Sequence, residues 1–305
     1  MDIIVKINRV VHRKILKIIP LLFAVLWSTG FVGAKYGLPY IEPFTFLSVR
    51  LILAILIIGF IVLLLKPPLP SERRQYYHLM VAGLFIHAFY LGGVFSAIDL
   101  GMTAGAVAVI VGMHPLFTVF LTHGFSSLKL NFIALLGFAG LLLVLFKGSE
   151  ANTQVILDES NQLYAYLFAV IALFGITFGT LYQKKYCAQV STITSAFIQY
   201  IPTCVVFCIV ALMFEYKQIH HIEWNVHLFF AIFWLVIVLS IGAVMLMNLL
   251  YQQNSASSAA SYFYLSPAIA LIISYFMFDE TLNMINVVGM FVIVVSLYYT
   301  NKLQQ

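Results

Sequence analysis

Apolar residues occur along this chain in continuous runs of about 20, and short polar segments separate the runs. A run of this length crosses a bilayer as a helix, whereas a transmembrane strand needs about 10 residues of alternating polarity. The pattern therefore predicts an all-α integral membrane protein. We expect ten transmembrane helices, at roughly Ile18–Tyr36, Pro43–Leu65, Tyr77–Ile98, Thr103–His123, Leu130–Phe146, Leu163–Tyr182, Thr192–Phe214, Val226–Leu250, Ala256–Phe278 and Asn283–Tyr299.

Composition excludes a water-soluble domain. Of the 305 residues, 63% are hydrophobic and 9% are charged, and the mean hydropathy is +1.02. A soluble domain carries about 25% charged residues. The net charge of +5 comes from basic clusters that flank the apolar runs, so it does not indicate a nucleic-acid partner. The three cysteines form no CxxC motif and the histidines form no HExxH motif, and we expect neither a metal nor a cofactor.

The N-terminal segment has two interpretations. Residues 1–17 carry five basic side chains ahead of an apolar run, as a signal peptide would, and Val32-Gly33-Ala34 resembles a cleavage site. However, the run is long enough to span the membrane, and its removal would destroy the arrangement of ten spans. We therefore expect residues 1–17 to be retained as a basic cytoplasmic tail.

Loop charges predict the orientation of the spans, because cytoplasmic loops carry an excess of Lys and Arg. If the N-terminus is inside, most acidic residues fall on the opposite side of the membrane. The cytoplasmic side then receives the basic tail together with Lys66, Arg73, Arg74, Lys129, Lys184, Lys185 and Lys302. Ten spans return the C-terminus to the cytoplasm, so both termini are predicted to be cytoplasmic.

Two small-residue-rich segments share one plan. A shift of 152 residues maps Thr103-Ala104 onto Ser255-Ala256 and Pro115 onto Pro267. This offset predicts two similar halves of five spans, residues 18–147 and 163–300, which an external loop at 148–162 joins. Halves with an odd number of spans must have opposite orientations, so the arrangement is an inverted repeat.

A resemblance to a known family supports the same arrangement. The segment LWSTGFVGAKYGLPYIEPFTFLSVRLILA, Leu26–Ala54, is similar to the first two helices of the EamA-type branch of the drug/metabolite transporter superfamily. The segment Ala256–Glu280 resembles the ninth helix of that family. The resemblance implies a ten-helix permease of a bacterial inner membrane that exports or exchanges small metabolites. One departure is that Ser126-Ser127-Leu128 stands where the family repeat often has an acidic residue.

Two histidines lie near the centres of consecutive predicted spans, His87 and His114. An ionisable side chain at this depth is unfavourable unless it faces a cavity or a partner. One interpretation is a neutral histidine that is hydrogen-bonded to its neighbours, and the other is a cavity wall. His114 lies about 200° around its helix from the small-residue face that ends at Gly112, and this position favours the cavity.

Other residues complete the predicted substrate site. Pro115 and Pro267 each free a backbone carbonyl one turn earlier, which suits a hinge or a broken-helix binding site, although membrane helices also tolerate prolines as simple kinks. Polar and aromatic residues of the first, third, eighth and ninth spans are further cavity candidates, and the alternative for them is ordinary packing: Trp27, Ser28, Tyr90, Asn248, Tyr251, Ser261 and Tyr264.

Lys35 and Arg50 are the basic residues within the predicted spans. Each lies close enough to the outer interface for its charged end to reach water. Arg50 is expected either to pair with an outer acid such as Glu42 or Asp99, or to contact a carboxylate or phosphate of the substrate. The resemblance suggests that Lys35 gates the outer mouth.

These features predict a secondary transporter that works by alternating access. Because no carboxylate lies deep in a span, protons are candidate coupling ions only if a histidine carries them. An amino-acid-like, aromatic or nucleoside-like solute suits the candidate residues, with export or exchange across the inner membrane. The alternatives are a sugar-phosphate-type exchanger, which would need more basic residues at the midplane, and an intramembrane enzyme, for which no paired catalytic groups occur.

Overall fold

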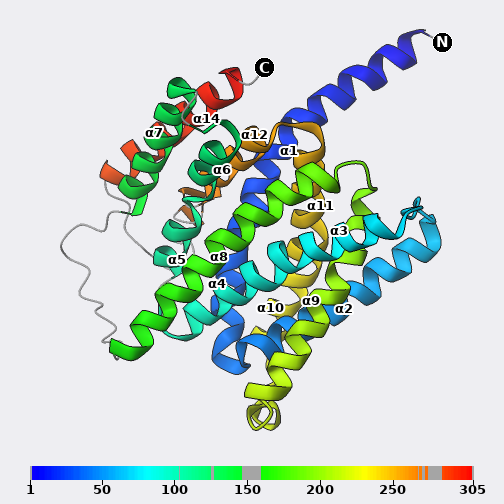
Figure 1. Ribbon diagram of the computed structural model, residues 1–305, viewed down its shortest axis with the longest axis vertical. Helices are drawn as coiled ribbons and strands as arrows, with labels where there is room; N and C mark the ends of the chain where they lie inside the picture. The colour runs from blue at the N-terminus through cyan, green and yellow to red at the C-terminus, as the bar shows by residue number, and fades with distance from the viewer. Residues whose placement is uncertain are drawn as a thin grey trace.

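The computed structural model describes residues 2–102, 104–124, 127–145, 159–266, 268–269, 272–273 and 284–303, and for residues 2–17 it describes the backbone alone. Every regular element within these residues is a helix, and no strand occurs among them. Figure 1 shows the helices packed against one another, with the N-terminal part of the first helix projecting from the bundle. The prediction of an all-α protein is confirmed for this part of the chain.

The first half of the chain contains α-helices and two short segments of other helix types. Its elements, in order, are α1 (Asp2–Gly37), the 3₁₀ turn η1 (Leu38–Tyr40), α2 (Pro43–Leu65), α3 (Arg73–Gly83), the π-helical segment η2 (Leu84–Phe89), α4 (Tyr90–Asp99), α5 (Ala104–Val111), α6 (His114–His123) and α7 (Leu128–Leu145).

The second half has a similar plan. Its elements are α8 (Glu159–Tyr186), α9 (Thr192–Phe214), the 3₁₀ turn η3 (Gln218–His221), α10 (Val226–Phe233), the π-helical segment η4 (Trp234–Ala243), α11 (Val244–Gln253), α12 (Ala256–Ser261), the 3₁₀ turn η5 (Tyr262–Tyr264) and α14 (Met284–Leu303).

The helix bounds agree closely with the apolar runs. Helices α2 and α9 begin and end at the predicted residues. Helix α1 begins at Asp2 and not near Ile18, because the basic segment continues the helix. Among the described residues, five helices are long and apolar enough to cross a membrane: Pro43–Leu65, Arg73–Asp99, Asn161–Tyr186, Thr192–Phe214 and Val226–Gln253. Shorter apolar helices cover Ile18–Phe31, Leu128–Gly140 and Val287–Thr300.

One predicted span is two helices. Between α5 and α6, Gly112 and Met113 form a turn, and His114 begins the next helix with Pro115 in its first turn. Proline has no N–H to donate, and its ring clashes with the carbonyl four residues earlier, which here belongs to Val111. The break therefore falls at the last residue of α5, as the sequence requires.

Two other predicted spans stay continuous but change their helix type. The third span passes from α3 through η2 into α4, and the eighth passes from α10 through η4 into α11. In a π-helical segment the backbone hydrogen bonds join residues five apart, one more than in an α-helix. Such segments are rare, and those that occur are frequently found at functional sites. A shift of residues 84–89 by 152 gives 236–241, which lie inside η4. The two π segments therefore occupy corresponding places in the two halves.

The two halves pack against each other along most of their helices. Helix α2 packs on α9, α7 packs on α14, and α6 packs on α12. The pairs α2–α9 and α7–α14 lie at opposite sides of the bundle in Figure 1. Helix α4 with η2 packs on α8, and α1 packs on α10 and η4. The interface between the halves is therefore the centre of the bundle.

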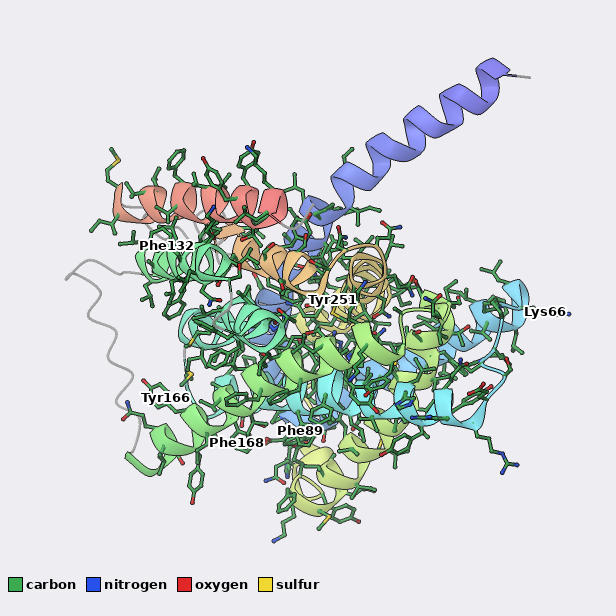
Figure 2. All side chains as sticks on the ribbon, turned by 45° about the horizontal axis from the view of Figure 1, so that its top comes forward. Lys66, Phe89, Phe132, Tyr166, Phe168 and Tyr251 are labelled. Carbon is green, nitrogen blue, oxygen red and sulfur yellow. The ribbon has the colours of Figure 1, made fainter. Side chains whose placement is uncertain are left out.

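Large apolar side chains cover the outside of the bundle. Phe60 and Leu63 on α2 are 62% and 73% exposed, and Phe132 on α7 is 68% exposed. Figure 2 shows Phe132 and Tyr166 at the periphery and Tyr251 within the bundle. An apolar surface of this extent suits hydrocarbon and not water. The polar side chains described below lie inside.

At one end of the bundle, a carboxylate from the second half caps a helix of the first. Glu215, which follows α9, accepts hydrogen bonds from the backbone N–H groups of Phe44 and Thr45, at 2.9 and 2.7 Å, and from the Thr45 hydroxyl at 2.7 Å. These donors are otherwise unpaired at the start of α2. Burial, together with the nearby carboxylates of Asp99 and Glu215, raises the pKa of Glu42 above its ordinary value.

Candidate functional site

A cavity of about 30 Å³ lies between the two halves, where α1, α2, η2 and α4 meet η4 and α11. This volume holds about two water molecules. Its lining combines apolar groups with the polar side chains of Arg50 and His87 and with four aromatic residues. The lining residues are Trp27, Gly30, Phe31, Arg50, His87, Tyr90, Leu91, Val94, Phe95, Leu239 and Val244. Apolar walls with a few convergent polar groups are typical of small-molecule sites.

An aromatic layer forms one side of the cavity. The ring of Trp27 on α1 stacks on Tyr90 of α4, with centroids 5.7 Å apart and an interplanar angle of 13°. Phe23 and Phe263 pack against Trp27 at 5.3 and 5.2 Å. Phe263 also contacts the ring of His114 edge-on, at 5.0 Å. This layer therefore separates the cavity from the surroundings of His114.

Arg50 reaches the cavity from α2. It is 4% exposed, and its Nε donates to the Ser240 hydroxyl at 2.8 Å. Ser240 lies in η4, and its backbone carbonyl accepts a hydrogen bond from the Tyr200 hydroxyl. Among the described residues, no ion pair and no acceptor for the Nη atoms of Arg50 is found. The predicted pairing of Arg50 with Glu42 or Asp99 is therefore wrong: the guanidinium is held by a neutral hydroxyl of the opposite half.

His87 connects the cavity to a chain of buried amides. Its Nε2 lies 3.3 Å from Oε1 of Gln199, Nε2 of Gln199 donates to Gln183 at 2.6 Å, and Nε2 of Gln183 donates to Asn248 at 3.1 Å. Because an amide oxygen only accepts, Nε2 of His87 carries the proton, and Nδ1 is left as an acceptor. For Nδ1, no partner occurs in the described part of the chain.

Close packing of α3 against α9 brings this chain together. A Cβ atom added at Gly83, one turn before His87, would lie 2.5 Å from the carbonyl oxygen of Gln199, so only glycine permits this approach. The four members of the chain are between 0% and 2% exposed. At its far end, Nδ2 of Asn248 is buried without a partner in the described residues. Buried amides of this kind define a specific arrangement of the helices when they are paired.

The second buried histidine has a different environment. Nε2 of His114 lies 3.1 Å from the Tyr251 hydroxyl, and Nδ1 lies 3.2 Å from Thr177 and 3.3 Å from Thr118. Both threonine hydroxyls donate to backbone carbonyls, those of Leu173 and His114. They must therefore accept from Nδ1–H, and Nε2 accepts from the tyrosine. Both ring nitrogens are satisfied by the protein.

The cavity includes four of the predicted site residues: Trp27, His87, Tyr90 and Arg50. The other candidates are buried, but they do not line this cavity. Ser28 donates to the carbonyls of Ala24 and Ser266 at 2.5 and 3.0 Å, Ser261 donates to Ser258 at 2.7 Å, and Tyr264 donates to Ala134 at 3.0 Å. Asn248 belongs to the amide chain, and Tyr251 and His114 bond each other.

Of the two prolines predicted as hinge residues, the structure describes Pro115. Pro115 is buried in the first turn of α6 and does not line the cavity. Pro267 and the side chain of Lys35 lie outside the described residues. Sequence reasoning missed the buried residues Gln183, Gln199, Tyr200 and Ser240. The signal for the two glutamines was present, because an amide inside an apolar span is as unusual as a histidine there.

Comparison with known proteins identifies the class of this protein. The model of the EamA-like transporter family matches residues 15–146 and again 163–302. These two matches cover most of the chain, so the chain belongs to the EamA-like transporter family. The double match also shows that the chain consists of two copies of the family unit. The protein is thus a multi-pass inner membrane transporter, and the family points away from an enzyme.

Individual relatives agree with this assignment. The chain is 26% identical over 288 residues to the "Uncharacterized inner membrane transporter YedA" of Escherichia coli (strain K12), which covers 92% of this chain and 90% of the relative. It is 26% identical over 283 residues to the "Uncharacterized transporter YvbV" of Bacillus subtilis (strain 168), with 91% and 88% covered. A solved protein crystal structure has the same fold, with a TM-score of 0.72 at 16% identity over 94% of this chain and 97% of that one.

Proposed function

We propose that this protein is a secondary transporter that moves a small organic metabolite across the inner membrane by alternating access, as an exporter or exchanger. In this proposal, ten spans form two five-helix halves of opposite orientation, with both termini in the cytoplasm. The observation that carries the proposal is the cavity between the halves, which Trp27, Tyr90, His87 and Arg50 line.

The pairing of helices supports an inverted repeat. When each helix is exchanged for its counterpart in the other half, the pairs α2–α9 and α7–α14 map onto themselves. The pairs that α3 and η2 form with α8 map onto the pairs that α10 and η4 form with α1, which also pack together. A two-fold relation between the halves produces this pattern, and transporters with such repeats bind their solutes at the interface of the repeats.

The size of the cavity supports alternating access. Sites for small molecules usually measure about 300–1,000 Å³, and this cavity measures about 30 Å³. A metabolite therefore enters only when the halves separate on one side. The π segments η2 and η4 lie on the third and eighth spans beside the cavity, and their corresponding positions suit them to bend in both directions of the cycle.

The lining favours a solute with a flat or apolar body and a few polar groups. Trp27 and Tyr90 offer an aromatic surface, and Nδ1 of His87 accepts from an N–H or O–H group of the solute. An amino-acid-like, aromatic or nucleoside-like metabolite has these features. A sugar-phosphate-type exchanger is less well supported, because the described residues of the lining include one cationic side chain, Arg50.

The test is solute flux in proteoliposomes that contain the purified protein. We expect saturable uptake of at least one radiolabelled amino acid or nucleoside, and a loss of most of this flux when Pro115→Ala and Pro267→Ala are combined. Pro202→Ala is the matched control, because Pro202 lies inside α9 away from the cavity. Full flux in the double variant would exclude the proposed role of the broken helices. Chemical turnover of a lipid or peptide without any solute flux would instead indicate an intramembrane enzyme.

A further inference from the structure

We propose that Arg50 selects solutes that carry a single carboxylate, and that its charge favours exchange over net flux. This inference rests on the proposed function and names the charge of the solute that the cavity accepts. It is carried by the position of one guanidinium group, by the bonds that hold it, and by the absence of other charges around it in the described part of the chain.

The guanidinium of Arg50 is buried, and no carboxylate of the described residues pairs with it. Its bond to the Ser240 hydroxyl, 2.8 Å long, supplies a neutral partner, and the described residues include no carboxylate within ion-pair distance. A buried positive charge without a counter-ion is unfavourable, and such residues in membrane proteins mark pathways of ions and substrates. An anion that enters the cavity supplies the missing partner.

The bond to Ser240 also orients the guanidinium. Because Nε is occupied and the described residues offer the Nη atoms no acceptor, Nη1 and Nη2 are left as donors on a side chain that lines the cavity. These two atoms match the two oxygens of a carboxylate and bind it in a bidentate manner. Ser240 is itself fixed, since its carbonyl accepts from Tyr200. Residues of both halves therefore hold the donor in one direction.

The rest of the lining limits the solute to one negative charge. Among the described residues, Arg50 is the cationic side chain of the lining, and Nε2 of His87 already donates to Gln199. A phosphate monoester would carry a second charge with no partner. Around Arg50 the walls are apolar and aromatic, and they suit the hydrocarbon or aromatic part of a monocarboxylate.

The charge of Arg50 also explains why exchange should be faster than net flux. In the closed state without solute, the guanidinium is buried and unpaired, whereas with a carboxylate bound the pair is neutral. The loaded protein therefore closes and reorients more readily than the empty protein. Flux should then be faster when the same solute is present on the far side of the membrane.

The experiment measures thermal stabilisation of the full-length protein in detergent by matched pairs of acids and primary amides, since a bound solute raises apparent stability. The acids are phenylacetate, 3-phenylpropionate, indole-3-acetate, L-phenylalanine and L-tryptophan, and phenyl phosphate is the dianionic probe. We expect at least one acid to stabilise the protein at a concentration about 30-fold lower than its amide, as the loss of a buried charged partner predicts. The Arg50→Gln substitution should weaken the binding of that acid by about 30-fold and leave the binding of its amide unchanged.

Matched variants and flux measurements keep the test decisive. Lys129→Gln removes an exposed cation and should leave the binding of acids and amides unchanged. Ser240→Ala should weaken the binding of the acid several-fold, because the guanidinium is then no longer held in place. If Arg50→Gln does not fold, the acid-to-amide ratio of the unmodified protein and the Ser240→Ala variant still decide the outcome. In proteoliposomes, the stabilising acid should exchange at least about 10-fold faster than it leaves into acid-free buffer.

Several results would overturn the assignment of Arg50: no acid stabilises the protein, amides bind as well as acids, phenyl phosphate binds better than every acid, or folded Arg50→Gln binds acids unchanged. Equal rates of exchange and net flux would overturn its second part. Saturable flux of neutral solutes alone would leave the proposed transport function intact and remove this inference. Selective binding of acids without any flux would support the role of Arg50 and contradict the proposed transport function.

Discussion

The two buried histidines are buried to a similar degree, but they differ in how completely their ring nitrogens are hydrogen-bonded within the protein. His87 is 2% exposed and His114 is 0% exposed. Protein groups bond both ring nitrogens of His114, and Phe263 packs on its ring. Within the described part of the chain, His87 has one side-chain hydrogen bond, 3.3 Å long, and it lines a cavity that also includes Arg50.

This difference teaches that burial alone does not identify a substrate site in a membrane protein. A polar group whose bonds are all made within the protein holds helices together, and here His114 joins α6 to α8 and α11. A polar group with an unused donor or acceptor at a cavity can bind a solute. We therefore expect substitutions near His114 to change stability, and substitutions near His87 to change solute affinity.

The largest effect is expected for His114→Leu. Leucine has a similar volume, but the Tyr251 hydroxyl loses its acceptor, and the hydroxyls of Thr118 and Thr177 lose the bond from Nδ1 while they keep those to backbone carbonyls. Each unsatisfied buried group costs about 1–3 kcal/mol, so the free energy of unfolding should fall by about 2–4 kcal/mol. Unfolding in mixed micelles measures this change. The solute affinity of the protein that remains folded should be unaltered, and a stable variant without solute binding would reverse the comparison.

His87→Leu is expected to have a smaller effect, and to change solute affinity more than stability. The variant loses the acceptor at the cavity, and the half-saturation concentration for flux should rise about 10-fold, which corresponds to about 1.4 kcal/mol. The free energy of unfolding should fall by about 1 kcal/mol, because Gln199 loses one weak bond. His227→Leu is the control, since His227 is exposed at the start of α10. An unchanged half-saturation concentration would remove His87 from the site.

The smallest effects come from single hydroxyl groups. Tyr251→Phe removes the donor to Nε2 of His114 and should lower the free energy of unfolding by about 1 kcal/mol, with no change in solute affinity. Tyr200→Phe removes the bond to the Ser240 carbonyl, behind Arg50, and should weaken solute binding about 3-fold. Equal effects of both variants on stability and affinity would contradict the division into two regions.

Much of the fold could be predicted from the sequence, because apolar length and proline act locally. The bounds of α2 and α9 follow directly from the apolar runs, and the break before α6 follows from Pro115. The π segments η2 and η4 could not be predicted, since each depends on packing across the bundle. The helical continuation through residues 2–17 was not predicted either, because apolar length marks only the membrane-spanning part of a helix.

The candidate site was predicted in part for a similar reason. His87 and Tyr90 were predicted as cavity residues from their place in the third span, and both line the cavity. The same geometry directed His114 to a cavity as well, yet its surroundings are Thr177, Tyr251 and Phe263. Spacing gives the direction of a side chain around its own helix. It does not say whether the neighbouring helix brings a hydroxyl or leaves a space.

The most direct test of the account asks where a transported solute binds. In a background without Cys187, Cys204 and Cys208, Val94→Cys places a thiol in the cavity, and Val119→Cys places one in the apolar packing between α6 and α7. These valines are 4% and 2% exposed, so their burial is closely matched. Alkylation by a membrane-permeant maleimide is measured with and without a solute that supports flux. The account predicts that the solute slows the labelling of Val94→Cys at least about 10-fold, in line with occupancy of one site, and leaves Val119→Cys unchanged. Protection of Val119→Cys without protection of Val94→Cys would contradict it.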